Sequence, residues 1–309
     1  MPSGANVRVV DRFIDAVLEV GQDKRFSILI DGIDPIWDMR TAESKLMIIG
    51  LLQTVREFNA CAAQKRPAGG PASAICFLRT DIFNGIEYSD RNKIQGGAIR
   101  LQWQESELID VVVRRARFLL GDESIGWNDF VTSVKMRSKL KAQGYLYRRT
   151  MERPRDLLAF VGAAARLAAN RKHLRIEVED IYDSEAEYAQ HIYDEMKDET
   201  FGNREEFMRI VQGLRRIGVN KFHSSKWIGL PLWETQLDGE KVLQNALGRS
   251  IVGIERVGGS LTGGRRGGTR VEYTYAGKGV TLPAGGATVV VHPTFVKVLS
   301  LKESRKKSQ

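Results

Sequence analysis

Two acidic residues follow an apolar segment near the start of the chain. Ser27 to Ile30 is typical of a buried strand, and Asp31 and Asp34 come just after it. A carboxylate at the end of an apolar strand favours a nearby cation, because burying an unpaired charge is costly. Asp31 would then hold magnesium through water, beside the phosphates of a nucleotide. The alternative is that Asp31 caps the following turn and Asp34 is merely exposed.

A phosphate-binding loop to accompany this carboxylate is missing from the sequence. Such a loop has the form G-x-x-x-x-G-K-[ST], whose backbone amides and lysine contact the phosphates and whose hydroxyl holds magnesium. The nearest match runs from Gly259 to Gly264, but Arg265 and Arg266 stand in place of the lysine and the hydroxyl. No helix is expected after it, so we interpret the match as accidental.

A second group of polar residues follows the next apolar run, "AICFL". Arg79, Thr80 and Asp81 come at its end. Ligands of open parallel sheets bind at the carboxyl ends of the strands, so Arg79 is placed to sense a terminal phosphate. The alternative is an arginine that pairs with Asp81 or Asp31.

Composition narrows the class of protein. The 47 basic and 38 acidic residues give a net charge of +9, which favours anionic partners such as nucleotides or nucleic acid. The two cysteines, Cys61 and Cys76, lack metal-ligand spacing and indicate a reducing compartment. No apolar run is long enough to cross a bilayer, and we expect a cytoplasmic protein.

Helical and strand patterns alternate in the first third of the chain. A helix is predicted over 6–20, a strand over 26–31, a helix over 42–60 and then the strand "AICFL". This order predicts an α/β fold with a parallel sheet and crossover helices. A weaker strand over 97–103 and a helix over 104–120 follow.

The remainder is predicted to be helical first and to contain strands near its end. Helical patterns extend from 127 to about 217. A further helix then precedes "IVGIERV", a glycine-rich segment at 258–268, "TRVEYTYAG" and "TVVVHPTFVKVL". A helix followed by a hairpin with a glycine-rich tip predicts a winged helix.

Five segments in this order resemble a known family: "ILIDGIDPIW", "ICFLRTDIF", "DRNKIQGGAIRLQW", "ELIDVVVRRAR" and "RPRDLLAF". They are similar to bacterial P-loop ATPases of the STAND and AAA+ type, over about residues 25 to 300. The resemblance implies an incomplete P-loop NTPase sheet from the Walker B strand onward, then a helical lid and a winged helix. The expected parts are 1–125, 126–217 and 218–301, with a basic tail at 302–309.

The resemblance also implies roles for individual residues. Asp31 matches the Walker B acid that holds magnesium, Asp34 keeps a nearby acidic position, and Arg79 matches the sensor after the next strand. Gly32 replaces the acid that often polarises the attacking water. Pro154 and Arg155 match the position from which the lid helix contacts adenine or phosphate. The alternative for "RPRD" is a simple helix start, capped by Thr150 and paired internally.

The family implies an ATP-dependent regulatory switch in signalling or antiviral defence, with ATP and Mg²⁺ bound in the complete protein. This chain alone is expected neither to bind ATP tightly nor to hydrolyse it. The expected partner is a missing N-terminal NTPase half, upstream of Met1 or on a separate chain, and a homo-oligomer is left open. Without such a partner, the free sheet edge favours aggregation.

A nucleic-acid-binding module is the alternative function. Winged helices present a helix to the major groove and a basic loop to phosphates. The candidate contacts between 218 and 300 are basic: Lys221, Lys226, Arg265, Arg266 and Arg270. In this interpretation the NTPase part is an inactive scaffold.

Overall fold

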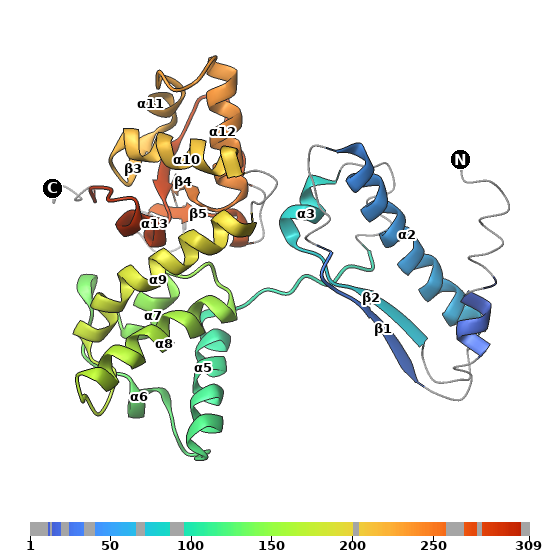
Figure 1. The fold of residues 1–309 in the computed structure, drawn as a ribbon, viewed down its shortest axis with the longest axis horizontal. Coiled ribbons are helices and arrows are strands. Elements are labelled where there is room, and N and C mark those ends of the chain that lie inside the picture. The colour runs from blue at the N-terminus through green and yellow to red at the C-terminus, as the bar shows by residue number, and fades with distance from the viewer. Residues whose placement is uncertain are drawn as a thin grey trace, which may run out of the picture. The chain divides into compact units, whose positions relative to one another are not determined.

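A computed structural model gives the fold of the chain (Figure 1). It describes residues 12, 14–19, 25–33, 41–65, 72–86, 96–199, 204–257, 269–276 and 280–303. The chain forms two compact units, Met1–Arg100 and Leu101–Gln309. No helix in these described ranges is both long and apolar enough to cross a membrane.

The first unit contains the predicted parallel pair of strands. Its elements are β1 (Phe26–Ile30), α2 (Ala42–Lys65), β2 (Ala72–Cys76) and α3 (Thr80–Gly85). β1 and β2 are parallel and in register from Phe26 opposite Ala72 to Ile30 opposite Cys76. Helix α2 crosses over between them, as a parallel connection requires. The α/β prediction is confirmed at this level.

Helix α2 covers one face of the two strands. Phe58 and Ala62 of α2 pack against Ala74 of β2, and Ile14 and Leu18 of the preceding helical residues join them. The Asn59 side chain accepts from the Ala74 N–H at 2.7 Å and donates to the Ala74 carbonyl at 2.9 Å. An amide that bonds both backbone groups of one residue fixes the helix against the strand.

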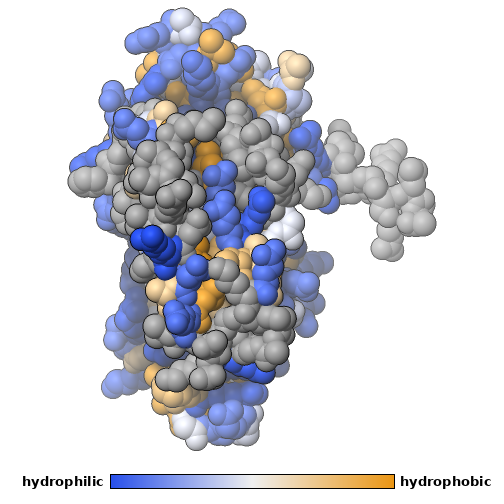
Figure 2. Space-filling view, turned by 90° about the vertical axis from the view of Figure 1, so that its right-hand side faces the viewer, coloured by the Kyte–Doolittle hydropathy of each residue, from blue (hydrophilic) through white to orange (hydrophobic). Residues whose placement is uncertain are grey.

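The opposite face of the strands is apolar and exposed. Leu29 and Ile75 are register partners, and they are 63% and 44% exposed, while Phe77 beyond β2 is 43% exposed. Figure 2 gives a space-filling view from the right-hand side of Figure 1, on which hydrophobic residues lie between hydrophilic ones. Parallel sheets usually have helices on both faces, so a face of this kind is suited to burial against further structure.

The predicted strand over 97–103 is wrong. Residues 96 and 97 form a turn, and 98–104 have no regular secondary structure. The alternating apolar residues Ile99, Leu101 and Trp103 are all exposed. The structure offers them no neighbouring strand among the described residues, and period-two alternation alone does not make a strand.

The helix predicted over 104–120 is present as α5 (Glu105–Leu120). It starts with a capping box in which Glu107 accepts from the Gln104 N–H at 2.8 Å. Its buried residues Leu108, Val112 and Val113 belong to the core of the second unit. The compact units therefore divide before α5, and the predicted boundaries at 125 and 217 stay predictions.

The second unit begins with helices. After α5 they are α6 (Trp127–Phe130), the 3₁₀ turn η2 (Arg137–Lys139), α7 (Ala142–Tyr147), α8 (Pro154–Asn170), α9 (Val178–Glu199) and α10 (Arg204–Ile217). Helices α8 and α9 pack along each other, and the Phe160 and Tyr188 rings stack between them with centroids 4.4 Å apart. The predicted helical segment is confirmed.

A four-stranded antiparallel sheet follows the helices. In chain order the elements are β3 (Lys221–His223), α11 (Ser224–Ile228), α12 (Gln236–Gly248), β4 (Val252–Val257), β5 (Thr269–Glu272), η4 (Thr274–Ala276), β6 (Thr288–Val291) and α13 (Pro293–Val298). The strand order is β3-β6-β4-β5. The expected helix and hairpin are α12, β4 and β5, while the segment 258–268 lies outside the described residues.

Two tryptophans illustrate how tightly this part is packed. A Cβ on Gly213 would lie 2.5 Å from the Trp227 ring, and a Cβ on Gly239 would lie 2.5 Å from the Trp233 ring. The Trp227 indole donates to the Gly239 carbonyl at 2.9 Å. Only glycine allows α10 and α12 to approach the rings this closely, so both positions exclude a side chain.

One continuous core joins the helices to the sheet. It runs from Leu108 in α5 through Phe160 in α8 and Trp227 in α11 to Val289 in β6. The segment after α13 bonds to the residues just before β3. The Lys302 N–H donates to the Gly218 carbonyl, and the Lys302 carbonyl accepts from the Asn220 N–H. The second unit is therefore one folded body rather than two loosely joined ones.

A buried carboxylate connects three elements of this body. Glu185 of α9 is 7% exposed, and it accepts from Arg149 Nε at 2.6 Å and from the Tyr145 hydroxyl at 3.1 Å. Lys297 Nζ of α13 lies 3.4 Å from Glu185 Oε2, the oxygen that accepts from Tyr145. The Arg149 guanidinium also lies 3.7 Å from the centre of the Tyr145 ring. We call these four residues the Glu185 network.

Replacing Glu185 by glutamine is expected to lower the free energy of unfolding by about 3 kcal/mol, because it leaves the guanidinium of Arg149 without its counter-charge in the interior. Glu187 is the matched control, since it lies on the same helix and its pair with Arg166 is exposed. Glu187→Gln should change the unfolding free energy by less than about 1 kcal/mol. Urea unfolding followed by circular dichroism measures both, and equal effects would contradict this assignment.

Candidate functional site

The candidate nucleotide site lies at the carboxyl ends of β1 and β2. Asp31 follows β1 directly, is exposed, and accepts from the Gly32 N–H at 2.8 Å. Gly32 has φ +71°, a left-handed conformation that glycine adopts without strain. The Asp31 carboxylate thus bonds the backbone N–H that follows it, which agrees with the alternative interpretation of a capped turn. An exposed carboxylate retains free oxygen lone pairs, so this turn is compatible with binding a cation.

The end of β2, at Cys76, lies beside Asp31, and Arg79 follows three residues later. The Phe77 N–H donates to the Ile30 carbonyl at 2.8 Å, which continues the pairing of the strands to their ends. Burial raises the pKa of the Cys76 thiol, and the negative charge of Asp31 raises it further. Arg79 is half-buried and precedes the first turn of α3. The structure therefore brings Asp31 and Arg79 to the same edge of the strand pair.

Part of the predicted site lies outside the described residues. Asp34 is one such residue, and the side chain of Asp81 is another. Among the described residues, no group of three or more histidine, cysteine, aspartate or glutamate side chains is arranged to hold a metal ion. Magnesium bound by Asp31 remains a prediction, and it would depend mainly on water and phosphate oxygens.

The second part of the predicted site is the start of α8. Pro154 occupies the first helical turn, where its missing N–H is not needed. Arg155 is 56% exposed, and its Nη1 lies 3.0 Å from Glu195 Oε1 of α9. This arginine is therefore paired, as the alternative interpretation expects, but its nearer partner is on α9 and not within "RPRD". Thr150 does not cap the helix, because its hydroxyl donates to the Tyr147 carbonyl instead.

Sequence reasoning missed the residue after Arg155. Asp156 is 1% exposed, and its Oδ2 accepts from the Met151 N–H at 3.2 Å. Its Oδ1 has no hydrogen-bond partner and lies 3.8 Å from Arg155 Nε. Burial raises the pKa of Asp156, against the opposing effects of Arg153, the Met151 N–H and Arg155. An acid in a first helical turn usually caps that turn, so the motif gave no signal of this burial.

Tyr188 lies beside this carboxyl group. Burial raises the pKa of the Tyr188 hydroxyl, and the charge of Asp156 raises it further, while Thr294 lowers it. Neither the hydroxyl nor Asp156 Oδ1 has a hydrogen-bond partner of ordinary geometry. Buried polar atoms without a hydrogen-bond partner are more frequent at functional sites than elsewhere. The start of α8 is therefore a candidate functional position.

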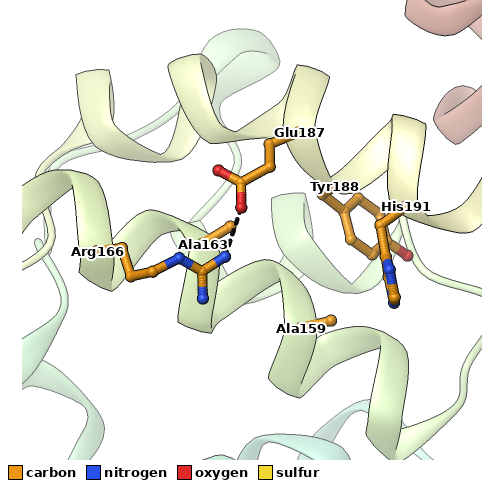
Figure 3. A pocket seen from close by; sticks show the side chains of 6 residues that line it. All are labelled: Ala159, Ala163, Arg166, Glu187, Tyr188 and His191. Atoms are coloured by element: carbon orange, nitrogen blue, oxygen red, sulfur yellow. Dashed lines mark hydrogen bonds and ion pairs between the residues drawn. The ribbon is translucent and has the colours of Figure 1, made fainter.

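A shallow pocket opens on the neighbouring surface of α8 and α9 (Figure 3). Its volume is about 270 Å³, and it is lined by Ala159, Ala163, Arg166, Glu187, Tyr188 and His191. The ion pair between Arg166 and Glu187 spans one end, as the dashed line shows. None of the predicted site residues lines this pocket, and its charged groups already pair with each other.

Two of the three described candidates for nucleic-acid contact have their charge neutralised by an ion pair. Lys221 Nζ lies 2.7 Å from Glu255 Oε1, and Arg270 Nη2 lies 2.6 Å from Glu272 Oε1. Lys226 is exposed on α11. Arg265 and Arg266 lie outside the described residues. Nucleic-acid binding by these five residues remains a prediction, and the two ion pairs weaken it.

Comparisons with known proteins give one partial family match. Residues 106–197, from α5 through most of α9, match the FunZ-associated C-terminal helical domain. The match covers less than half of the chain and includes Arg155, Asp156 and Glu185. No curated protein matches the sequence.

Among solved structures, the chain is similar to Cdc6p from Pyrobaculum aerophilum at 13% sequence identity and a TM-score of 0.34. The similarity covers 94% of this chain and 69% of that one. No function is transferred from so distant a likeness.

Replacing Asp156 by asparagine should stabilise the protein increasingly as pH rises. A carboxyl group whose folded pKa is raised above its unfolded value of 3.8 stabilises the fold at low pH, and this contribution is lost as pH rises through the folded pKa. Asparagine does not titrate. The unfolding free energy of Asp156→Asn minus that of the wild type should therefore increase upward from about pH 4, by about 1.4 kcal/mol per unit of pKa elevation.

Urea unfolding between about pH 4 and 8 measures this difference. Asp156→Ala serves as the control, because it also removes the acceptor for the Met151 N–H and should destabilise the protein at every pH. A difference between Asp156→Asn and the wild type that stays constant or falls with pH would contradict the assignment.

Proposed function

We propose that this chain is part of a P-loop ATPase of the STAND or AAA+ type, a nucleotide-dependent regulatory switch in signalling or antiviral defence. One observation supports it above all: β1 and β2 are adjacent and parallel, with Asp31 and Arg79 following them at one edge. This is the edge at which open parallel sheets bind ligands.

Each residue of this edge has a role in the proposal. Asp31 holds Mg²⁺ through water, Asp34 provides a further acidic group, and Arg79 detects the terminal phosphate. Gly32 carries no side chain that could polarise water, so hydrolysis is slow and the nucleotide acts mainly as a switch. ATP and Mg²⁺ are the ligands of the complete assembly.

The phosphate-binding loop is supplied by a segment outside these 309 residues, in the same polypeptide or in a second chain. The exposed apolar face of Leu29 and Ile75 supports this proposal, because further strands and helices would bury it. β1 and β2 form a two-stranded sheet in the described part of the chain, so the outer edge of each is open to a further strand.

By the family resemblance, Pro154 and Arg155 at the start of α8 are the lid residues that would contact adenine or phosphate. Arg155 is already held by Glu195, so a bound phosphate must compete with that carboxylate for the guanidinium. Exchange of Glu195 for phosphate would give the lid two states of different energy. The C-terminal sheet acts as a winged helix, for which the order of α12, β4 and β5 is the support.

Calorimetric titration with ATP and Mg²⁺ tests the proposal. The chain alone is expected to give no binding heat up to about millimolar ATP, because amides and a lysine for the phosphates are missing. When it is assembled with the loop-bearing segment, binding should tighten to about micromolar. Arg155→Gln should then weaken binding by about tenfold or more, and Glu195→Gln should strengthen it, since Arg155 loses its competing partner.

Arg166→Gln is the matched control, because Arg166 is another exposed, ion-paired arginine of α8 and should leave affinity unchanged. Micromolar ATP binding by the chain alone, abolished by Asp31→Ala, would show that the phosphate site is complete without an outside segment. An assembled protein that binds no nucleotide would refute the switch as a whole.

A further inference from the structure

One segment of the helical part is unusually basic. Between Asp129 and Glu152 the chain has six basic residues and no acidic one. Four of them lie in the 3₁₀ turn η2 or within two residues of it. We call the segment that carries them the basic loop, and its basic residues are Lys135, Arg137, Lys139 and Lys141. They stand at every second position, separated by residues of other kinds.

The basic loop is held in place by its apolar residues. Met136 is buried, and Leu140 packs against the core of the unit. The Met136 N–H donates to the Leu140 carbonyl at 2.8 Å, which closes the loop at its base. Lys139 has φ 58°, a conformation that only a fixed surrounding structure maintains for such a residue. The apolar side chains are directed inward, and the basic ones are exposed.

Tyr182 of α9 fixes the centre of the loop. Its hydroxyl accepts from the Arg137 N–H at 2.6 Å, and the Arg137 guanidinium lies 4.6 Å from the centre of its ring. The backbone of the loop is therefore ordered before any partner binds. An ordered loop loses less conformational entropy on binding than a flexible one.

The four basic side chains have no ion-pair partner among the described residues. Arg149, Arg166 and Arg171 differ from them, because each is paired with a carboxylate of α9. In the first turns of α9, Asp180 and Asp183 are thus already engaged by Arg171. Glu179, three residues before Tyr182, is exposed and in no ion pair among the described residues. The loop keeps a surplus of positive charge.

We propose that the basic loop binds the phosphate backbone of nucleic acid. Regularly spaced, exposed cations match a polymer with one negative charge per nucleotide, and such binding needs no base contacts. Met136 and Leu140 face inward, and Val134, before Lys135, is the one exposed apolar residue beside the loop among the described residues. A single exposed valine is too little apolar surface to insert into a membrane or to form the centre of a protein interface. Lys221 and Arg270 are not part of this proposal, because their charges are paired.

The test measures binding of the whole chain to labelled nucleic acid of about 24 nucleotides or base pairs, as duplex DNA, duplex RNA and single-stranded DNA. Fluorescence anisotropy is followed from about 50 to 200 mM salt. In the variant K135Q/R137Q/K139Q/K141Q, the slope of log affinity against log salt on duplex DNA should become shallower by about 3 to 4, since each phosphate contact contributes about 0.9. At the lowest salt its affinity should fall by about 100-fold or more.

The control variant K172Q/R216Q/K241Q/K302Q has the same net charge and removes three exposed lysines and one exposed arginine elsewhere. It should bind within about threefold of the wild type, because long-range charge is screened beyond a Debye length of about 10 Å. Circular dichroism confirms that both variants are folded.

Three results would overturn the proposal: no binding of the wild type to any of the three nucleic acids, equal losses in the two variants, or loop-dependent binding to phosphatidylserine vesicles without binding to nucleic acid. Loop-dependent binding to DNA or to RNA supports it, and the comparison of the two identifies which one the loop prefers.

Discussion

The second unit depends on a carboxylate that the interior must neutralise. Glu185 is almost completely buried, and an isolated charge in that position would cost several kcal/mol. Arg149 and Lys297 supply the compensating charge, and Tyr145 supplies a hydroxyl. These groups come from the region of α7, from α9 and from α13. A single side chain therefore links the helical part of the unit to the end of the chain.

This connection limits how the proposed switch can move. Rearrangement of the helical lid against the C-terminal sheet would separate Glu185 from Lys297 of α13 and open a continuous apolar core. Movement of residues 101–309 as one body leaves both intact. Exchange of partners by Arg155, which is exposed and pairs with Glu195, requires much less reorganisation. In the proposed mechanism, Arg155 changes its partner while the body around Glu185 stays rigid.

The first unit differs in its energetics. Its apolar contacts are divided between two small clusters on α2, and Leu29 and Ile75 remain exposed. Burying such residues would contribute about 25 cal/mol for each Å² removed from water. An added segment that covers this face would therefore stabilise the first unit as well as complete the proposed nucleotide site.

Parts of this structure follow from local sequence patterns. The two apolar runs separated by an amphipathic helix predicted the parallel pair, and Pro154 predicted the start of α8. The turn at Asp31 was foreseeable as an alternative, because Gly32 can adopt positive φ. Other features depend on distant residues. The alternation of Ile99, Leu101 and Trp103 resembles a strand, but a strand also needs a neighbour with which to pair.

The ion pairs show the same dependence on tertiary structure. Glu185 lies in a segment with several acidic residues, and nothing local separates it from Glu187, which is exposed. The pairing of Lys221 with Glu255 depends on the order of strands in the sheet, so the sequence showed Lys221 as a free cation. Charge that is available for binding can therefore be identified only after these pairs are known.

The most direct test of the account is native-state hydrogen exchange of the whole chain, measured against increasing urea. If residues 101–309 are one body, the slowest amides of α9 and of β4 should open with the same free energy and the same dependence on urea. The amides of β1 should exchange much sooner. A sheet that keeps its protection at a urea concentration where α8 and α9 have already exchanged would contradict the account.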